Sequence, residues 1–207
     1  MYPCNPCVQP MSLVRVLHAS PDAPPVDVYV NNRKVISSLP FKNLSGYLPL
    51  RPGRYNIKVY PAGKTSNPVI NQNVRVVAGS VITLAAINKV KNIELYPIMD
   101  GLKQPRSEKP FVRFAHLSPN APAVDIRLED GTLLFRNADY QDVTRYLEVE
   151  PGTYTLEVFL AGTKRKVLTV PNVVLQPGLM YTVYAVGLVN DEPPLQTLTV
   201  IDSYYQR

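Results

Sequence analysis

The residue types in this sequence that could do chemistry occur twice, in the same order. Residues 14–30 read VRVLHASPDAPPVDVYV, and 98 residues later residues 112–128 read VRFAHLSPNAPAVDIRL. Each copy holds a His, a Ser and an Asp: His18, Ser20 and Asp27 in the first, His116, Ser118 and Asp125 in the second. Such residues could form a hydrolytic triad, supply part of a metal site, or stabilise a turn between two strands.

A Ser-His-Asp hydrolase would need its serine on a strained turn, next to backbone N–H groups that stabilise an oxyanion. Ser20 is followed by Pro21, and a proline has no backbone N–H to donate. No Gly-x-Ser-x-Gly motif surrounds either serine. We therefore expect no enzyme activity and no catalytic residue.

A metal site is also not expected. One His and one Asp in each copy fall short of the three or four ligands of a tight site. Asp22 could add a carboxylate, but the second copy has Asn120 in its place. Weak calcium binding by the loops LEDG (128–131) and DYQD (139–142) stays open, although both lack the spacing of a known calcium motif. We expect no metal and no other cofactor.

The favoured interpretation is a structural clamp of strand, turn and strand. In each copy the Asp or Asn of the turn could close that turn on its own backbone, and the next proline would direct the chain into the second strand. The imidazole could satisfy a buried loop carbonyl. Arg15 and Asp27 occupy strand positions that alternate with the inward-facing apolar residues, as do Arg113 and Asp125. Each copy could therefore form a cross-strand ion pair. The clamp residues are Arg15, His18, Asp22, Asp27, Arg113, His116, Asn120 and Asp125.

The repeat continues beyond this motif. YLPLRPGRYNIKVYPAG at residues 47–63 returns as YLEVEPGTYTLEVFLAG at residues 146–162. Apolar residues alternate with polar ones in segments such as VDVYV, and Pro-Gly turns precede several of these segments, which predicts short half-buried strands. Each copy is therefore predicted to be a seven- or eight-stranded β-sandwich, immunoglobulin-like or transthyretin-like, in an all-β chain.

Four segments follow from this repeat. We expect a flexible N-terminal arm with the cysteines (1–12), a first sandwich (13–100), a polar linker (101–109) and a second sandwich (110–207). The copies share the core His-x-Ser-Pro-x-Ala-Pro-x-Val-Asp, and this core, together with the YLPLRPGRYNIKVYPAG and VVAGSVITLAAI segments, resembles the bacterial DUF4397 family in tandem. The resemblance implies β-sandwich modules of envelope and extracellular proteins, with no established activity.

The arm contains the only cysteines of the sequence, Cys4 and Cys7. A redox-active Cys-x-x-Cys should open a helix, and no helix is predicted there. Two cysteines alone cannot complete a zinc site. We expect intermolecular disulfides at Cys4 and Cys7, with an unmodified tail as the alternative. The arm loosely resembles the Cys-containing N-terminal connectors of endospore fibre subunits.

The net charge of +6 is unevenly distributed. Residues 1–100 contain eleven Lys or Arg and four Asp or Glu, whereas residues 101–207 contain eleven and twelve. A basic half can bind nucleic acid, but these charges are scattered singly and the aromatic motifs of RNA-binding sheets are absent, so we expect no nucleic acid partner. No apolar span approaches the about eighteen residues of a membrane helix, and no secretory signal peptide is evident.

We therefore expect a non-enzymatic structural or self-assembling protein of the bacterial spore surface or cell envelope, such as a fibre or appendage subunit, linked through its arm. The expected partners are other copies of the chain and other envelope or spore-coat proteins, without membrane insertion. The alternative is an adhesin or carbohydrate-binding module that uses exposed tyrosines and loops. If the basic and acidic halves of neighbouring copies meet, association should weaken as salt rises.

Overall fold

Two sets of eight strands make up the described part of the chain. A computed structural model describes residues 9–101 and 108–202, and it confirms the all-β prediction. The first set is β1 (Ser12–His18), β2 (Val26–Val30), β3 (Arg33–Leu39), β4 (Leu48–Leu50), β5 (Gly53–Pro61), β6 (Ile70–Val76), β7 (Val81–Ile87) and β8 (Glu94–Met99), with a 3-10 turn η1 (Val90–Asn92). The second set is β9 (Phe111–His116), β10 (Val124–Leu128), β11 (Leu133–Ala138), β12 (Leu147–Glu148), β13 (Gly152–Leu160), β14 (Lys166–Leu175), β15 (Met180–Val186) and β16 (Gln196–Ile201).

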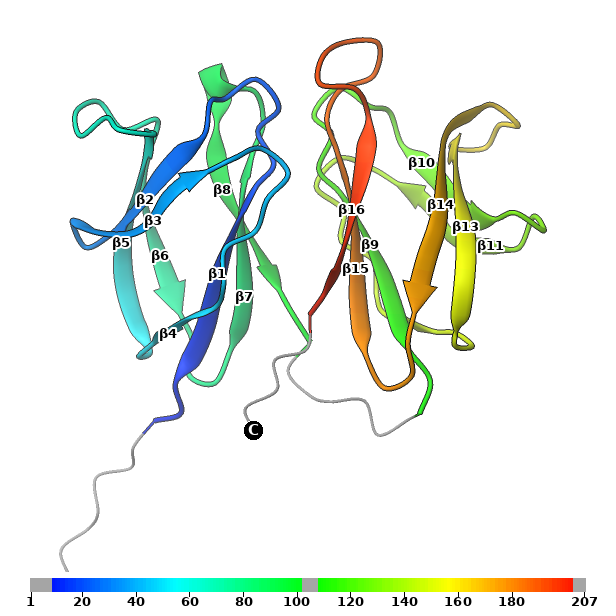
Figure 1. Ribbon diagram of the computed structural model, residues 1–207, viewed down its shortest axis with the longest axis horizontal. Coiled ribbons are helices and arrows are strands. Elements are labelled where there is room, and N and C mark those ends of the chain that lie inside the picture. Colours follow the sequence, from blue (N-terminus) through cyan, green and yellow to red (C-terminus); the bar gives the residue numbers. More distant parts are fainter. Residues whose placement is uncertain (1–8, 102–107, 203–207) are drawn as a thin grey trace, which may run out of the picture.

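Each set forms a sandwich of two four-stranded sheets, and the two sandwiches lie side by side (Figure 1). The first sandwich combines the sheets β4-β1-β7-β8 and β3-β2-β5-β6, and the second combines β12-β9-β15-β16 and β11-β10-β13-β14. In each sandwich the first strand runs parallel to the seventh, as β1 does to β7 and β9 to β15. The predicted repeat is therefore a repeat of topology as well as of sequence.

The core of each sandwich lies between its own two sheets. In the first, Val14 and Val16 of β1 pack with Val26 and Val28 of β2, together with apolar residues of the other long strands. These side chains recur at every second position because successive residues of a strand point to opposite faces. The predicted alternation therefore identified the faces that close each sandwich.

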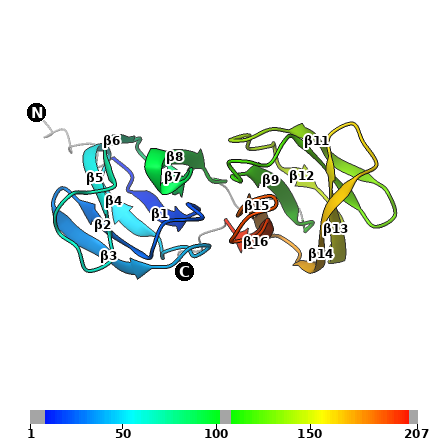
Figure 2. The ribbon, with the colours of Figure 1, turned by 90° about the horizontal axis from the view of Figure 1, so that it is seen from above.

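A third apolar core joins the two sandwiches. The sheet β4-β1-β7-β8 packs against the sheet β12-β9-β15-β16, which produces four stacked layers with two outer and two inner sheets (Figures 1 and 2). The inner strands β1, β7, β9 and β15 are consequently buried on both faces. Burial on both faces explains their nearly continuous apolar sequences, such as VITLAAI and MYTVYAV.

Corresponding positions of the two copies carry side chains of different size in this third core. The large and small residues are Leu17 against Ala115, Leu117 against Ala19, and Tyr184 against Ala85. Because interiors are packed closely, such a distribution fills one joint volume rather than two identical ones.

No helix in the described residues is long and apolar enough to cross a membrane.

Candidate functional site

The two histidines of the repeated motif are the last residues of β1 and β9, and both are buried. His18 is 0% exposed, and its Nε2 lies 3.0 Å from the carbonyl oxygen of Pro24. His116 lies 3.2 Å from the carbonyl oxygen of Pro122 in the same way. A carbonyl can only accept, so each Nε2 donates. Burial lowers the pKa of both imidazoles, which favours the neutral form.

The aspartates of the motif hold an irregular strand pair. Asp27 accepts hydrogen bonds from the Ser38 N–H at 2.8 Å and the Gly63 N–H at 3.1 Å, and it pairs with Lys34 Nζ at 2.6 Å. Ser38 has a positive φ of 50°, next to a register shift between β2 and β3. The Lys34 ammonium, with the two N–H donors, lowers the pKa of Asp27. Its carboxylate therefore stabilises a β-bulge.

The second copy repeats this arrangement with a different cation. Asp125 accepts from the Asn137 N–H at 2.8 Å and the Gly162 N–H at 3.2 Å, and its cationic neighbour is Arg127 at 3.6 Å. Burial raises the pKa of Asp125, but these hydrogen bonds to the charged form outweigh it, and the pKa lies below its usual value. Both aspartates have roles in the outer sheets.

The predicted ion pairs of Arg15 with Asp27 and of Arg113 with Asp125 are wrong. That prediction treated the two strands of the motif as neighbours in one sheet. In the structure β1 and β2 belong to opposite sheets of the sandwich, as do β9 and β10. Arg15 and Arg113 lie on the faces that meet between the sandwiches, and their carboxylate partners come from the ends of the two repeats.

The predicted turn closure by Asp22 and Asn120 is also wrong. Asp22 Oδ1 accepts from the Val90 N–H at 2.7 Å. Asn120 Oδ1 accepts from the Val189 N–H at 2.8 Å, and its Nδ2 donates to the Val189 carbonyl at 3.0 Å. Both side chains thus connect their turn to the loop that follows the seventh strand of the same sandwich, because that loop presents unpaired backbone groups nearby.

The serines do not join the histidines and aspartates in a triad. Ser118 Oγ donates to the Gly187 carbonyl at 2.7 Å, and Ser20 Oγ is buried without a hydrogen-bond partner among the described residues. In the same part of the chain, no three His, Cys, Asp or Glu side chains gather where they could hold a metal ion. Cys4 and Cys7 lie outside the described residues.

The largest concentration of buried charge lies between the two sandwiches. Arg15 Nη2 contacts Asp202 Oδ1 at 2.6 Å, and Arg113 Nη2 contacts Asp100 Oδ1 at 2.8 Å, so that each sandwich gives an arginine to the other. All four side chains are at least 94% buried. We call this the interdomain cluster, and its members are Arg15, Tyr47, Thr83, Asp100, Arg113, Tyr146, Thr182 and Asp202.

Threonines and tyrosines complete the hydrogen bonding of the cluster. Asp100 accepts from Thr83 Oγ1 at 2.6 Å and Tyr47 Oη at 2.9 Å, and Asp202 accepts from Thr182 and Tyr146 in the corresponding way. The guanidinium of Arg15 lies 4.7 Å from the ring centre of Tyr47, within the range of a cation–π contact. Burial raises the pKa of Asp100 and of both tyrosines. The cluster is buried, paired and approximately two-fold symmetric.

Sequence reasoning missed this cluster, although a signal for it exists. Thr83 and Thr182 interrupt two strongly apolar strands at the same place, and Asp100 and Asp202 close the two repeats. A charged or polar residue repeated within buried strands needs a partner. These repeated polar positions could have indicated a shared polar centre between the halves.

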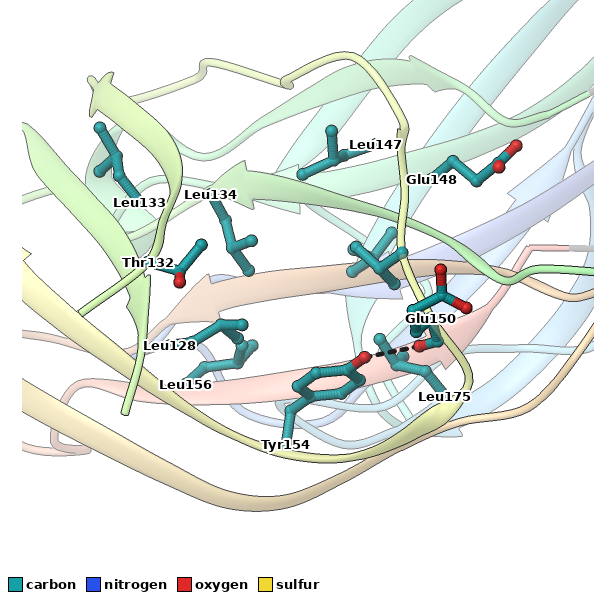
Figure 3. A pocket seen from close by; sticks show the side chains of 12 residues that line it. Leu128, Thr132, Leu133, Leu134, Leu147, Glu148, Glu150, Tyr154, Leu156 and Leu175 are labelled. Atoms are coloured by element: carbon teal, nitrogen blue, oxygen red, sulfur yellow. Dashed lines mark hydrogen bonds between the residues drawn. The ribbon is translucent and has the colours of Figure 1, made fainter. Parts of the chain in front are cut away.

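A pocket opens on the second sandwich between the edge strands β11 and β12 (Figure 3). This β11–β12 pocket has a volume of about 370 Å³. Leucine side chains from both sheets surround it, and Glu148 and Glu150 lie at one side (Figure 3). Tyr154 Oη donates to the Glu150 carbonyl at 2.6 Å. At the mouth, Leu133 is 36% and Leu147 38% exposed.

The corresponding space in the first sandwich is nearly filled, with a volume of about 10 Å³. The two copies differ in the hairpin at the mouth. Asn31 and Asn32, both at positive φ, join β2 to β3, which is the tightest type of hairpin turn. Residues 129–132 join β10 to β11, with Gly131 at φ 88°. The open pocket is therefore a property of the second copy.

One protein family matches nearly the whole chain. The family described as Domain of unknown function (DUF4397) matches residues 12–127 and 128–204. The chain belongs to the DUF4397 family. This confirms the tandem DUF4397 assignment, although the matched segments meet at the end of β10 whereas the sheets divide between β8 and β9. No curated protein matches this DUF4397 protein.

Solved structures resemble this DUF4397 protein only remotely. The C-terminal domain of AlgF from P. aeruginosa is 24% identical, with a TM-score of 0.36, over 45% of this chain and 98% of that domain. The family CBM26 module CBMbc of Eubacterium rectale Amy13K, solved with maltoheptaose, is 10% identical, with a TM-score of 0.28, over 93% and 98%. A proposed cell adhesion protein of Bacteroides ovatus is 8% identical, with a TM-score of 0.29, over 96% and 99%. Similarities this remote carry no argument about function.

His18→Ala should destabilise the first sandwich by about 1–3 kcal/mol, because the buried Pro24 carbonyl loses its donor. Chemical denaturation followed by circular dichroism measures the loss. His116→Ala should act similarly on the second sandwich, while leaving any activity of the first intact. An unchanged melting temperature in both variants would count against the clamp.

The same histidines should make stability depend on pH. Their folded-state pKa values are lowered by burial, so below about pH 6.5 the unfolded chain binds protons that the folded chain does not. Stability is then complete above about pH 6.5 and decreases as pH falls, by up to about 1.4 kcal/mol per pH unit for each histidine. Denaturation between about pH 7.5 and 5.5 measures this slope, which a His18→Gln, His116→Gln double variant should flatten.

Proposed function

We propose that this DUF4397 protein is a non-enzymatic structural protein whose two sandwiches act as one rigid building block. The interdomain cluster is the observation that carries this proposal. Four buried charges are paired across the interface, and any sliding of one sandwich on the other would leave them unpaired in an apolar core. A fixed orientation of the two sandwiches is what a subunit of a regular assembly requires.

Copies of this block are proposed to join through the N-terminal arm, with disulfides between chains at Cys4 and Cys7. A disulfide within the arm would close a very short loop and stabilise little. Two thiols per chain allow one link to the preceding copy and one to the following copy. The bacterial spore surface or cell envelope suits such links, because disulfides persist outside the reducing cytosol. Other envelope or spore-coat proteins are further partners in this proposal.

Non-reducing gels of the oxidised protein test the arm. We expect ladders that collapse with reductant, filaments in electron micrographs, and a Cys4→Ser, Cys7→Ser variant that runs as a monomer on denaturing gels. Mass spectrometry that finds only free thiols, or only a bond between Cys4 and Cys7 of one chain, would show that the arm is not a covalent linker.

Binding of an acidic saccharide is a second candidate function with an observation of its own. A cavity of about 520 Å³ on the second sandwich is lined by Arg127, Arg136 and Lys164. The carboxylate that also lines it, Asp125, is bound to two backbone N–H groups, so positive charge dominates the cavity. The first copy has Tyr29, Ser37 and Thr65 in place of these cations.

A glycan array tests this candidate. Uronate-containing or sulfated glycans should be retained, and an Arg136→Gln, Lys164→Gln variant should lose at least tenfold in affinity. Lys166→Gln is the control, because Lys166 pairs with Glu157 at 2.7 Å and does not line the cavity. Retention of neutral glycans alone, or equal loss in the control, would contradict this candidate.

A further inference from the structure

We infer that the β11–β12 pocket of one copy binds the N-terminal arm, residues 1–8, of a second copy. The inference rests on the proposed function, in which copies join through the arm, and it adds the surface that receives the arm. Three features carry it: the pocket itself, the composition and reach of the arm, and opposite charges at the two surfaces that would meet.

The pocket offers an extended segment both side-chain space and backbone partners. It is apolar and about 370 Å³ in volume, whereas the equivalent space of the first sandwich is about 10 Å³. β11 and β12 are the edge strands of their sheets. Edge strands present N–H and C=O groups to which an added strand can bind, while neighbouring pockets take its side chains.

The arm has the composition that such a pocket requires. Residues 1–8 read MYPCNPCV, which contains no charged side chain and includes a methionine, a tyrosine and a valine. Its two prolines restrict the backbone and so reduce the entropy lost on binding. Eight residues extend to about 26 Å at about 3.3 Å per residue. The arm can therefore cross from its own sandwich to a neighbouring molecule.

The surfaces around the arm and the pocket carry opposite charge. β1 begins at Ser12, which is paired with Leu50. Nearby are three exposed arginines: Arg51 in the β4–β5 turn, Arg54 at the start of β5, and Arg75 opposite it on β6. None of these arginines forms an ion pair with a described residue. At the same end of the second sandwich, Glu150 stands in place of Arg51, and Glu148 in place of Pro49.

These charges favour contact between the first sandwich of one copy and the second sandwich of the next. Glu150 pairs with Lys109, and the carboxylate of Glu148 then gives the rim of the pocket a net negative charge. The sheet that contains β11 faces away from the first sandwich of its own chain (Figure 2). Two different surfaces would meet, and such heterologous contacts build rings or open chains of subunits instead of two-fold dimers.

The test uses the full chain with Cys4→Ser and Cys7→Ser, so that only non-covalent docking is measured. Sedimentation velocity should show association that a synthetic peptide of residues 1–11, with the same serine replacements, inhibits. Leu147→Glu should weaken association at least tenfold, and the matched change Leu48→Glu in the closed first copy less than twofold. Circular dichroism of both variants confirms folding.

Charge reversal provides a second, independent test. Glu148→Arg with Glu150→Arg should weaken association at least tenfold, and Arg51→Glu with Arg54→Glu in the same chain should restore most of it. Raising the salt concentration from about 50 mM to about 500 mM should weaken association of the parent protein, because exposed charges are screened.

Several outcomes would overturn the inference. One is disulfide-linked ladders of the parent protein that are unaffected by Leu147→Glu, which would keep the arm as a linker but place it elsewhere. Another is a pocket that binds an apolar dye but not the peptide. If the parent protein forms no disulfide-linked ladders and the Cys4→Ser, Cys7→Ser protein does not associate, the proposed function itself is rejected.

Discussion

Asp202→Asn should lower the free energy of unfolding by about 3–5 kcal/mol, because it leaves the Arg15 guanidinium buried without its closest charge partner. Arg15 lies 2.6 Å from Asp202 but 3.4 Å from Asp100. The more distant carboxylate of Asp100 would therefore compensate only in part for the lost charge of Asp202. Denaturant unfolding of the parent should be a single transition, because the third apolar core and the interdomain cluster join the two sandwiches. The variant should unfold at lower denaturant, with the two sandwiches separating into distinct transitions.

Asp191→Asn is the matched control for this loss. Asp191 also forms an ion pair across the two sandwiches, with Lys89 at 3.1 Å, but it is about half exposed. Exposed pairs contribute about 0–1 kcal/mol. Equal effects of Asp202→Asn and Asp191→Asn would mean that burial of the interdomain cluster does not hold the sandwiches together.

Tyr184→Ala should cost about 3–5 kcal/mol, because it empties a large volume in the core between the sandwiches. Tyr184 is 0% exposed, and its hydroxyl has no hydrogen-bond partner among the described residues. Tyr184→Phe keeps the ring and removes this buried hydroxyl, so stability should be unchanged or rise by up to about 1 kcal/mol. Thermal and chemical denaturation of the pair separate ring packing from hydroxyl burial.

Tyr146→Phe is the control for the hydroxyl. Tyr146 Oη donates to Asp202 at 2.7 Å, so removing it should cost about 1–3 kcal/mol. If Tyr184→Phe proves as damaging as Tyr146→Phe, then the hydroxyl of Tyr184 has a partner, and the packing explanation of that residue is wrong.

The sandwich of each copy could be predicted because its signals are local. Alternation in VDVYV and the Pro-Gly turns depend on neighbouring residues alone, and both recur in the second copy. The covering of the inner sheets could not be predicted in the same way. Arg15 and Leu17 lie on the same face of β1, and a face with both charged and apolar residues is typical of a solvent-exposed sheet surface. Only the packing of the second sandwich against this face buries both side chains.

The motif residues show where strand parity fails as a guide. Parity correctly separated Arg15 from His18, but it said nothing about whether Arg15 and Asp27 share a sheet. Ion-pair partners 187 residues apart, as in Arg15 and Asp202, follow from the packing of whole domains. The β11–β12 pocket could not be predicted either, because its lining residues come from both sheets of the second sandwich and meet only when the sheets pack.

The unequal residues of the third core have a consequence for how the halves recognise each other. A pair of first halves would bring together two Ala85 residues and no Tyr184, and a pair of second halves would bring together two Tyr184 residues. The first pairing would be underfilled and the second overcrowded, and each fault costs stability. The chain therefore resembles a covalently joined heterodimer, in which each half packs well against the other half but not against a second copy of itself.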